Sequence, residues 1–459
     1  MKKTNKLLSI ALLAMFSLSA HGQVITTIAN VDTTAGYNGD GIAASSAHLF
    51  TPAGIAVDHA GNIYVSDADN YRIRKIATDG MISTVAGNGI QGYSGNDGPA
   101  TAAEIHTPLG LTTDNAGNIY FCDNYNNCVR KVSTDGIITR FAGDTGMAMR
   151  GYGADGIPAT ASKFGQTNYI VADNSGNVYI SDYLFGTADS SRIRKVDPSG
   201  IVTTFAGGGT SSADGIAATA AILNVPSGLA IDGLGNVYVS CNNTVRRIDA
   251  SGIITTVAGP GPASVPFYFT GDGGPATAAS INGGFGSPDA IATDADGNLY
   301  IGDQGHFRIR KVNSSGIIST VAGVGLDGYS GDGGYATYAR IGTPLGLAFD
   351  RSGNLLMTDY DNNCIRSVTY AVFVPENEHP ALGINLFPNP SRGIFTMTIG
   401  SNSNTQARIT IMDMAGQQVK DFAAATNKPV DVSLDVSTGL YLVVASTAEG
   451  KWSRQVVIE

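Results

Sequence analysis

The sequence predicts an all-β protein, a six-bladed β-propeller closed by its N-terminal strand and followed by a small antiparallel β-sandwich. Two observations lead to this prediction. A stretch first seen at residues 52–87 recurs along the chain and, in its sixth copy, lacks the final strand. The Asn of its Gly-Asn turn recurs at intervals of 56 to 62 residues, at Asn62, Asn118, Asn177, Asn236, Asn298 and Asn354. A fixed period of this size indicates a repeat architecture.

Each copy contains four short segments that are typical of β-strands. In the first copy they cover residues 54–58, 62–67, 71–76 and 81–87, and turns rich in Gly, Asn and Asp separate them. A four-stranded antiparallel unit that repeats around an axis is a propeller blade. A helical solenoid would show a 3.6-residue period, which is absent, and a sandwich would not repeat itself.

The two ends of the repeat region complement each other. The sixth copy covers residues 344–368 and stops after its third strand, whereas a strand of the missing type occurs at residues 24–30, before the first copy. We expect this N-terminal strand to complete the sixth blade, because closing the ring removes exposed strand edges.

Composition and charge exclude several classes of partner. The 459 residues include 59 Gly, and the net charge is −10 with no Lys/Arg block, so we expect no nucleic-acid partner. Residues 1–22 have the basic start and apolar stretch of a signal peptide, with cleavage after Gly22 or, alternatively, after Ala20. We expect no transmembrane segment in the rest of the chain.

The core of each copy resembles NHL repeats. Residues 52–75 read PAGIAVDHAGNIYVSDADNYRIRK, and the linker at residues 92–105 reads GYSGNDGPATAAEI. This combination is similar to the long-linker repeats of secreted bacterial proteins and teneurin-like ectodomains. The resemblance covers residues 24–368 and implies a β-propeller within the expected domain at residues 23–368.

An Arg recurs in the third strand of every copy, and an Asp ends the second strand in five of them. We expect repeated structural contacts through charge-assisted hydrogen bonds, since so many identical pairs would make no single catalytic site. The pairs are Asp67 with Arg74, Asp123 with Arg130, Asp182 with Arg194, Asp303 with Arg310, and Asp359 with Arg366. The fourth copy has Cys241 in place of the Asp.

The linkers between copies share a Gly/Asp cluster that allows two interpretations. The carboxylates could bind calcium, or each Asp could cap the short helical turn that follows while Gly permits the bend. We favour the structural interpretation, because near-identical residues in six copies suit a scaffold. The calcium-like sequence at residues 294–298 is interpreted as a hairpin turn, because it aligns with such turns elsewhere.

Departures from the repeat supply the candidate ligand-binding residues. The strand order places the linkers and the second-to-third turns on one face, hereafter the candidate face, because long loops tend to carry function. An alternative is that the departures are drift in tolerant loops. The candidates are Asn168 and Tyr169 at the start of the third inner strand, Asp289 near the channel mouth, and Phe267, Tyr268 and Phe269 in an enlarged linker. The turn at residues 183–191 is also longer than its counterparts.

Catalytic and metal-binding groups are sparse. Some six-bladed enzymes that resemble this scaffold, the amidating lyases among them, hold a metal in the channel with several His. Here His48 and His106 lie on the candidate face, but His59 falls on the opposite face and His306 in an outer turn. We therefore expect no cofactor, no bound metal and no catalytic residue.

Four cysteines remain in the expected exported chain. Cys122 and Cys128 flank a second-to-third turn and could form a disulfide, or they could be two small buried side chains. Cys364 occupies the position of Cys128 in its own copy, where we expect Thr358 as its cross-strand neighbour. That mismatch weakens the disulfide hypothesis.

Residues 383–459 form a second domain after a Pro-containing linker at residues 369–382. Alternating segments predict an antiparallel sandwich. The domain resembles the type A sorting domain of the type IX secretion system of Bacteroidetes through Pro388, Asn389, Pro390, Gly393, Asp413, Gly416, Gly439 and Tyr441. The resemblance implies the secretion machinery as a partner, export across the outer membrane, and removal of the domain. Release or attachment to surface lipopolysaccharide would follow.

These observations predict a secreted or outer-membrane surface protein that binds or scaffolds without catalysis. We expect a monomer whose ligand is a protein or a glycan. The alternatives are a lyase or hydrolase with its active site at the central channel, and a purely structural spacer.

Overall fold

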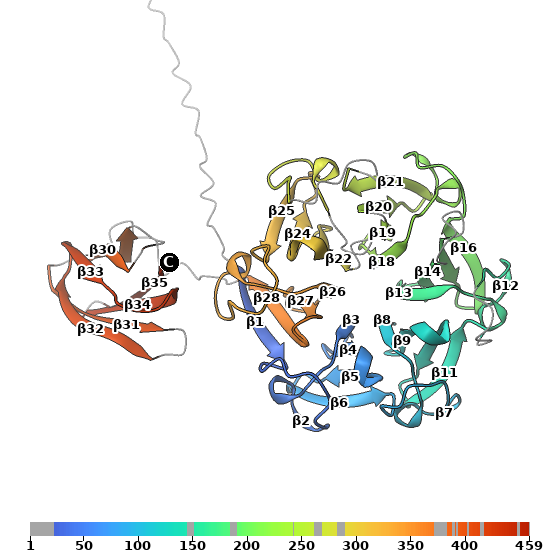
Figure 1. Cartoon of the computed structure of the whole chain (residues 1–459). Coiled ribbons are helices and arrows are strands. Elements are labelled where there is room, and N and C mark those ends of the chain that lie inside the picture. Colours follow the sequence, from blue (N-terminus) through green and yellow to red (C-terminus); the bar gives the residue numbers. More distant parts are fainter. Residues whose placement is uncertain are drawn as a thin grey trace, which may run out of the picture.

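The computed structural model describes residues 23–144, 151–183, 191–241, 243–260, 269–281, 290–370, 383–387, 391, 393–401, 404–413, 417–447 and 450–458. The expected signal peptide and Gly22 lie outside these residues. The described chain consists of β-strands and short 3-10 turns. Figure 1 shows the sheets formed by residues 23–370 arranged around a common centre, as in a propeller.

The first two repeats each form a five-stranded antiparallel sheet. The first contains β2 (Ile42–Ala43), β3 (Pro52–Val57), β4 (Ile63–Asp67), β5 (Arg72–Ile76) and β6 (Met81–Ala86), in the order β2-β6-β5-β4-β3. The second contains β7 (Gly98–Pro99), β8 (Pro108–Thr113), β9 (Ile119–Asp123), β10 (Cys128–Val132) and β11 (Ile137–Ala142), in the order β7-β11-β10-β9-β8.

The next two repeats have the same arrangement. The third sheet contains β12 (Ile157–Pro158), β13 (Gln166–Ala172), β14 (Val178–Tyr183), β15 (Arg192–Val196) and β16 (Ile201–Gly207), in the order β12-β16-β15-β14-β13. The fourth contains β17 (Ile216–Ala217), β18 (Pro226–Ile231), β19 (Val237–Cys241), β20 (Thr244–Ile248) and β21 (Ile253–Ala258), in the order β17-β21-β20-β19-β18.

The last two sheets have four described strands each. The fifth contains β22 (Ile291–Thr293), β23 (Leu299–Asp303), β24 (Arg308–Val312) and β25 (Ile318–Ala322), in that order. The sixth combines β26 (Pro344–Phe349), β27 (Leu355–Asp359) and β28 (Cys364–Tyr370) with β1 (Gln23–Ala29), in the order β1-β28-β27-β26.

The two ends of the repeat region meet in the sixth sheet. β1 pairs antiparallel with β28, and Gln23 lies opposite Tyr370. Because of this pairing, β28 continues two residues beyond Val368, where the sequence predicted the linker to begin. The side chain of Ile25 is fully buried in the core between the fifth and sixth sheets. The N-terminal strand is therefore the outer strand of a sheet whose other strands lie more than 300 residues away.

Four sheets contain a short fifth strand that the sequence did not predict. β2, β7, β12 and β17 come from the linkers and pair with the outer strands β6, β11, β16 and β21. Each has only two residues, which is too short for an alternating pattern to show in the sequence. The pairing satisfies backbone groups at an edge that would otherwise face solvent.

Short 3-10 turns connect the strands at two recurrent places. In the linkers they are η1 (Ala44–Ser46), η3 (Ala100–Ala102), η5 (Ala159–Ala161), η7 (Ala218–Ala220), η8 (Ala276–Ala278) and η10 (Ala336–Tyr338). Between second and third strands they are η2 (Ala68–Asn70), η4 (Asn124–Asn126) and η9 (Gln304–His306). The expected Asp caps are wrong: the linker turns begin after Ala, Pro or Tyr and have no side-chain cap.

The hairpin between first and second strands is held by one Asp in each repeat. In the first repeat, Asp58 accepts hydrogen bonds from the backbone of Asn62 (2.9 Å), from the Asn62 amide (2.7 Å) and from the Tyr64 hydroxyl (3.1 Å). Asp294 accepts the equivalent bonds from Asn298 and Tyr300. The calcium-like sequence at residues 294–298 is therefore a hairpin turn, as the sequence predicted.

The inner strands pack closely enough to require glycine. A Cβ atom on Gly54 would collide with the backbone carbonyl of Leu109 in the next sheet, and one on Gly346 would collide with that of Ala53. Across the latter junction, between the sixth and first sheets, Thr358 donates a side-chain hydrogen bond of 2.8 Å to the Ala53 carbonyl. The Pro-x-Gly start of the inner strand is thus a packing requirement of neighbouring sheets.

Residues 383–458 form two antiparallel sheets around one separate core. The first contains β29 (Gly383–Phe387), β30 (Ile394–Gly400) and β33 (Pro429–Ser433), and the second contains β31 (Gln406–Asp413), β32 (Gln418–Ala425), β34 (Gly439–Thr447) and β35 (Gly450–Ile458). Both sheets contribute to the core, including Phe395, Met397, Ile409 and Val443. The sequence missed β32, in which only Ala424 is buried, because so exposed a strand carries little hydrophobic signal.

Candidate functional site

Tyr169 lies at the centre of the ring. It occupies the position that is Gly in the repeat pattern, and its hydroxyl donates a hydrogen bond of 2.6 Å to the backbone carbonyl of Leu345. β13 and β26, which carry these residues, face each other across the centre in Figure 1. The Tyr169 backbone N–H also donates to the Ser181 hydroxyl at 2.8 Å. The backbone of Tyr169 is therefore held by its own sheet, and its side chain reaches across to β26.

Asn168, the other candidate on this strand, contacts the neighbouring sheet. Its side-chain oxygen accepts a hydrogen bond of 2.8 Å from the amide of Asn124, which also donates to the Thr167 carbonyl at 3.0 Å. Asn124 is buried in the second-to-third turn η4. Asn168 thus joins the second and third sheets at the candidate face.

In most of the sheets, the Arg of the third strand lies between two carboxylates. The first carboxylate is the predicted Asp at the end of the second strand. The distances from its oxygen to the guanidinium nitrogen are 3.4 Å for Asp67–Arg74 and Asp123–Arg130, 3.9 Å for Asp182–Arg194, 3.1 Å for Asp303–Arg310 and 3.8 Å for Asp359–Arg366. These Asp and Arg side chains are fully buried. Because each charge has an opposite partner, the pairs are compatible with the interior.

The second carboxylate comes from the linker and was missed by the sequence analysis. The contacts are Asp40–Arg74 at 3.0 Å, Asp155–Arg194 at 2.9 Å, Asp214–Arg246 at 2.8 Å, Asp272–Arg310 at 2.8 Å and Asp332–Arg366 at 2.6 Å. In the second repeat the Ser94 carbonyl accepts from Arg130 instead, at 3.0 Å. These linker carboxylates are therefore engaged by guanidinium groups, which supports the structural interpretation of the Gly/Asp cluster.

An aromatic ring of the linker covers the same Arg cluster. Tyr37 lies 3.9 Å from the Arg72 guanidinium, and Phe269 lies 3.9 Å from Arg308 and 4.5 Å from Arg310. Such contacts are favourable cation–π interactions. Phe269, predicted as an exposed contact residue, is partly exposed and contacts these Arg side chains through its ring. Phe267, Tyr268, Asp289 and most of the long turn at residues 183–191 lie outside the described residues.

Burial sets the electrostatics of the second-strand carboxylates. Desolvation raises the pKa of Asp67, Asp123 and Asp359 to about 6, and that of Asp182 to about 7. Nearby Arg groups and hydrogen-bond donors oppose the shift. Asp182 differs from Asp67 and Asp123 because no described residue donates a hydrogen bond to its Oδ2. These carboxyls are buried beside the third-strand Arg side chains.

The histidines do not converge. His106 stacks on Tyr125 with 4.7 Å between ring centroids, and His48 lies 3.6 Å from the Asp32 carboxylate. The ring of His306 is buried with its Nδ1 2.8 Å from Asp303. Among the described residues, no three His, Cys, Asp or Glu side chains are grouped as metal ligands would be.

The four cysteines are free thiols and all are buried. In the ladder Cys128 lies opposite Asp123, and Cys122 lies opposite Val129. Since successive side chains of a strand point to opposite faces, Cys122 and Cys128 project from different faces of the sheet. The counterpart expected for Cys364 is also wrong by one residue, because Cys364 lies opposite Asp359.

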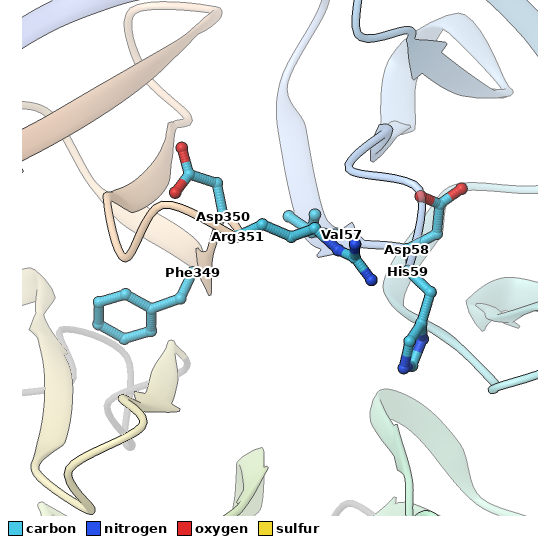
Figure 2. A pocket seen from close by; sticks show the side chains of 6 residues that line it. All are labelled: Val57, Asp58, His59, Phe349, Asp350 and Arg351. Carbon is cyan, nitrogen blue, oxygen red and sulfur yellow. The ribbon is translucent and has the colours of Figure 1, made fainter.

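A shallow open pocket lies between the first and sixth sheets on the face opposite the candidate face. Val57, Asp58, His59, Phe349, Asp350 and Arg351 line it (Figure 2). The Asp58 and Asp350 carboxylates accept hydrogen bonds from Asn62 and Asn354 of their own hairpins, at 2.7 and 2.8 Å. Both carboxylates are therefore engaged in turn structure, and the pocket offers two exposed basic side chains above an apolar floor.

The described residues of the predicted sorting motif hold turns. Gly393 has φ +83°, and a Cβ atom there would lie 2.6 Å from the Leu434 carbonyl. The Asp413 carboxylate accepts a hydrogen bond of 2.8 Å from the Gln417 backbone, and the Tyr441 hydroxyl donates to the Ser437 carbonyl at 2.8 Å. Gly439 begins β34, while Pro388, Asn389, Pro390 and Gly416 lie outside the described residues.

Comparison with known families tests both resemblances. Residues 385–459 match the Secretion system C-terminal sorting domain, and residues 30–92 and 208–266 match the Teneurin NHL domain. The chain joins NHL repeats to a secretion-system sorting domain. Both resemblances are therefore confirmed, and the sorting domain indicates export by the type IX system to the cell surface or the outside. It also implies contact with the secretion machinery.

The relatives of the NHL region are much longer proteins. Teneurin-4 of Mus musculus is 28% identical over 353 residues, which cover 70% of this chain and 12% of the relative. Teneurin-1 of Gallus gallus is 27% identical over 344 residues, which cover 69% of this chain and 10% of the relative. The chain thus spans about a tenth of the length of these curated relatives.

Solved structures show the same fold. A protein of unknown function from Bacteroides thetaiotaomicron has a TM-score of 0.53 at 19% identity, and an auxiliary nutrient binding protein from the same organism has a TM-score of 0.53 at 14% identity. Each match covers 76% of both chains. At these identities the likeness shows the propeller fold alone. Within the described part of the chain, the search for an apolar helix long enough to cross a membrane finds none.

Proposed function

We propose that this protein is an extracellular, non-catalytic binding propeller whose partner contacts the candidate face. In this proposal the six sheets are six blades, β1 closes the ring, and the sorting domain brings the protein to the cell surface or the medium. The partner is a protein or a glycan. The competing function is a lyase or hydrolase with its active site at the central channel.

The observation that carries the proposal is the position of Tyr169. Propeller ligands that enter the channel need an open path along the axis. Here the side chain crosses that axis and is held by the Leu345 carbonyl at 2.6 Å. Asn168 next to it is engaged by Asn124 at 2.8 Å. A substrate in the channel would have to break these contacts, whereas a partner on the candidate face would leave them intact.

The use of the charged groups also supports a binding role. The buried carboxylates pair with the third-strand Arg residues, the linker carboxylates pair with the same guanidinium groups, and the hairpin carboxylates hold turns. General acid–base chemistry needs a carboxyl or imidazole that faces the substrate. Among the described residues, these recurrent carboxylates are all committed to the scaffold.

A ring closed by β1 is supported by contacts at the junction of the sixth and first sheets. Thr358 donates to the Ala53 carbonyl at 2.8 Å, and the Thr51 backbone N–H donates to the Asn363 side chain at 3.0 Å. The inner strands β26 and β3 contact each other, as do β22 and β26. Each sheet then has a neighbour on both sides, and the radial repetition leaves only short, protected edges.

The proposal is tested by binding arrays with the full-length exported protein. Arrays of extracellular proteins and of glycans would be probed with the intact protein and with Tyr169→Gly, which restores the Gly of the repeat and opens the channel. We expect the same partner to bind both proteins. Turnover of a lactone, ester or glycoside that increases in Tyr169→Gly, without any partner on the arrays, would instead support the channel enzyme.

A further inference from the structure

Three neighbouring turns of the candidate face carry residues that break the repeat. The middle residue of the second-to-third turn is Asp69 in the first sheet, Tyr125 in the second and Asp361 in the sixth, whereas it is Gly305 in the fifth. Tyr360 precedes Asp361. Since a scaffold repeats like residues and a binding site combines unlike ones, these four side chains, Asp69, Tyr125, Tyr360 and Asp361, are defined here as the turn cluster.

Hydrogen bonds join the turns of the first and sixth sheets. The backbone N–H of Asp69 donates a hydrogen bond of 3.2 Å to the carbonyl of Phe50. Thr51, the residue after Phe50, donates its backbone N–H to the Asn363 side chain at 3.0 Å. The segment at residues 50–51 therefore lies between the two turns. The exposed fraction of Phe50 is 38%, so this segment presents an apolar side chain to solvent.

Stacked rings join the turns of the first and second sheets. Tyr71, which follows the turn of Asp69, meets His106 edge-on at 6.2 Å, and His106 stacks on Tyr125 at 4.7 Å with 21° between the planes. Burial lowers the pKa of His106, which favours its neutral form. The stack holds one face of Tyr125 against an uncharged ring. Because 53% of Tyr125 remains exposed, its other side is available to a partner.

The turn cluster has negative charge that no described cation neutralises. Asp69 is exposed and forms no ion pair within the described part of the chain, and the Asp361 carboxylate accepts only from Thr343, at 2.8 Å from its N–H and 2.6 Å from its hydroxyl. Arg72, in the strand after the first turn, is engaged by the Tyr37 ring and by the Asn88 carbonyl.

The phenol of Tyr360 is influenced by the other three groups of the turn cluster. Burial raises its pKa, and the charges of Asp69 and Asp361, together with Tyr125, raise it further. Groups from three different sheets thus influence one hydroxyl. Two phenol rings, one apolar ring and two carboxylates are thus carried by three neighbouring sheets on the candidate face.

We propose that the turn cluster binds a cationic side chain, Lys or Arg, presented by a protein partner. An ammonium or guanidinium group is attracted both to the carboxylates and to the aromatic rings of the cluster. It forms ion pairs with the former and cation–π contacts with the faces of the latter. A neutral glycan could stack on Tyr125 but would gain nothing from the two charges. The inference rests on the proposed function and names the class of partner for the same face.

The test measures binding of fluorescein-labelled hexa-arginine to the full-length protein by fluorescence anisotropy, with hexaglutamate and maltohexaose as competitors. We expect hexa-arginine to bind and neither competitor to displace it. Replacing both carboxylates, Asp69→Asn with Asp361→Asn, should weaken binding by about tenfold or more. Tyr125→Ala should also weaken it, whereas Tyr125→Phe, which keeps the ring, should bind within about twofold of the intact protein.

A matched control separates the site from the overall negative charge. Asp79→Asn with Asp135→Asn removes two charges from exposed turns on the opposite face and should leave binding unchanged. Equal weakening in both double variants would overturn the proposal, and so would displacement by maltohexaose that depends on Tyr125. Displacement by maltohexaose would leave the proposed binding function intact, whereas catalytic turnover at the channel would contradict that function. Asp69→Asn alone gives an independent reading, because its exposed carboxylate forms no hydrogen bond or ion pair with any described residue.

Discussion

The hydroxyl of Tyr169 bonds to the carbonyl of Leu345 at 2.6 Å, although the two residues are 176 positions apart and begin inner strands on opposite sides of the ring. Every repeat whose inner strand begins Pro-x-Gly has no side chain at this position. The contact therefore forms a bridge between the third and sixth sheets.

Removing this hydroxyl should weaken the ring. Tyr169→Phe should lower the free energy of unfolding by about 0.5–1.5 kcal/mol, because the Leu345 carbonyl loses its donor. Urea unfolding followed by fluorescence would measure the change. Tyr125→Phe is the matched control, since its hydroxyl is exposed, and it should unfold like the intact protein. Equal stability of all three proteins would show that the bridge does not form.

The N-terminal strand should be essential to the fold. Deleting residues 24–30 would expose the edge of β28, and we expect aggregation during size-exclusion chromatography. Ile25→Ala, at a fully buried position, should cost about 2–5 kcal/mol in the free energy of unfolding. Thr26→Ala, at a partly exposed neighbour, should cost much less. A truncated protein that melts like the intact one would refute closure by β1.

The two carboxylates beside each Arg should contribute unequally. Asp303 is fully buried, so Asp303→Ala removes the buried partner of Arg310, leaves it only the partly exposed Asp272, and should cost about 3–5 kcal/mol. The side chain of Asp272 is 36% exposed, so Asp272→Ala should lower the free energy of unfolding by at most about 1 kcal/mol. Thermal melting monitored by circular dichroism would compare them. The reverse order would mean that the linker contact dominates the stability of the sheet.

Stability should fall as the pH rises through neutrality. Burial raises the pKa of Asp182 to about 7, above its ordinary value of 3.8. A carboxyl whose pKa is higher in the folded state than in the unfolded state contributes its full stabilisation below the pKa of the unfolded state. This contribution is lost as the pH rises through the pKa of the folded state. Urea unfolding should therefore give a larger free energy at about pH 5 than at about pH 8. Asp182→Asn should flatten this dependence, and an unchanged slope in the variant would exclude Asp182 as its source.

The sequence contained the repeat, the positions of its strands and the Asp–Arg positions, because these features recur and need no knowledge of distant contacts. It did not reveal the linker carboxylates as Arg ligands: Asp40 and Arg74 are 34 residues apart, and a Gly/Asp cluster suits turns, metals and ion pairs alike. It also missed β32, whose side chains are mostly exposed, and the two-residue strands such as β2, which are too short to show a period.

The candidate site was predicted only in part. Tyr169 was identified because it breaks the repeat, but its partner Leu345 could not be, since a contact across the ring leaves no local pattern. Phe269 also breaks the expected composition, yet its ring covers Arg308 as the Tyr rings of other linkers cover their Arg. Tyr125 was overlooked, because a single aromatic residue in a turn has no signature until the stack with His106 is seen.

The most direct test of the binding account compares Tyr125→Ala with Tyr169→Gly against the partner that the arrays identify, by isothermal titration calorimetry. The account predicts that Tyr125→Ala loses at least about tenfold in affinity, because it removes a ring of the candidate face, while Tyr169→Gly retains the affinity of the intact protein. The opposite pattern, with affinity lost in Tyr169→Gly and kept in Tyr125→Ala, would place the ligand in the channel and contradict the account.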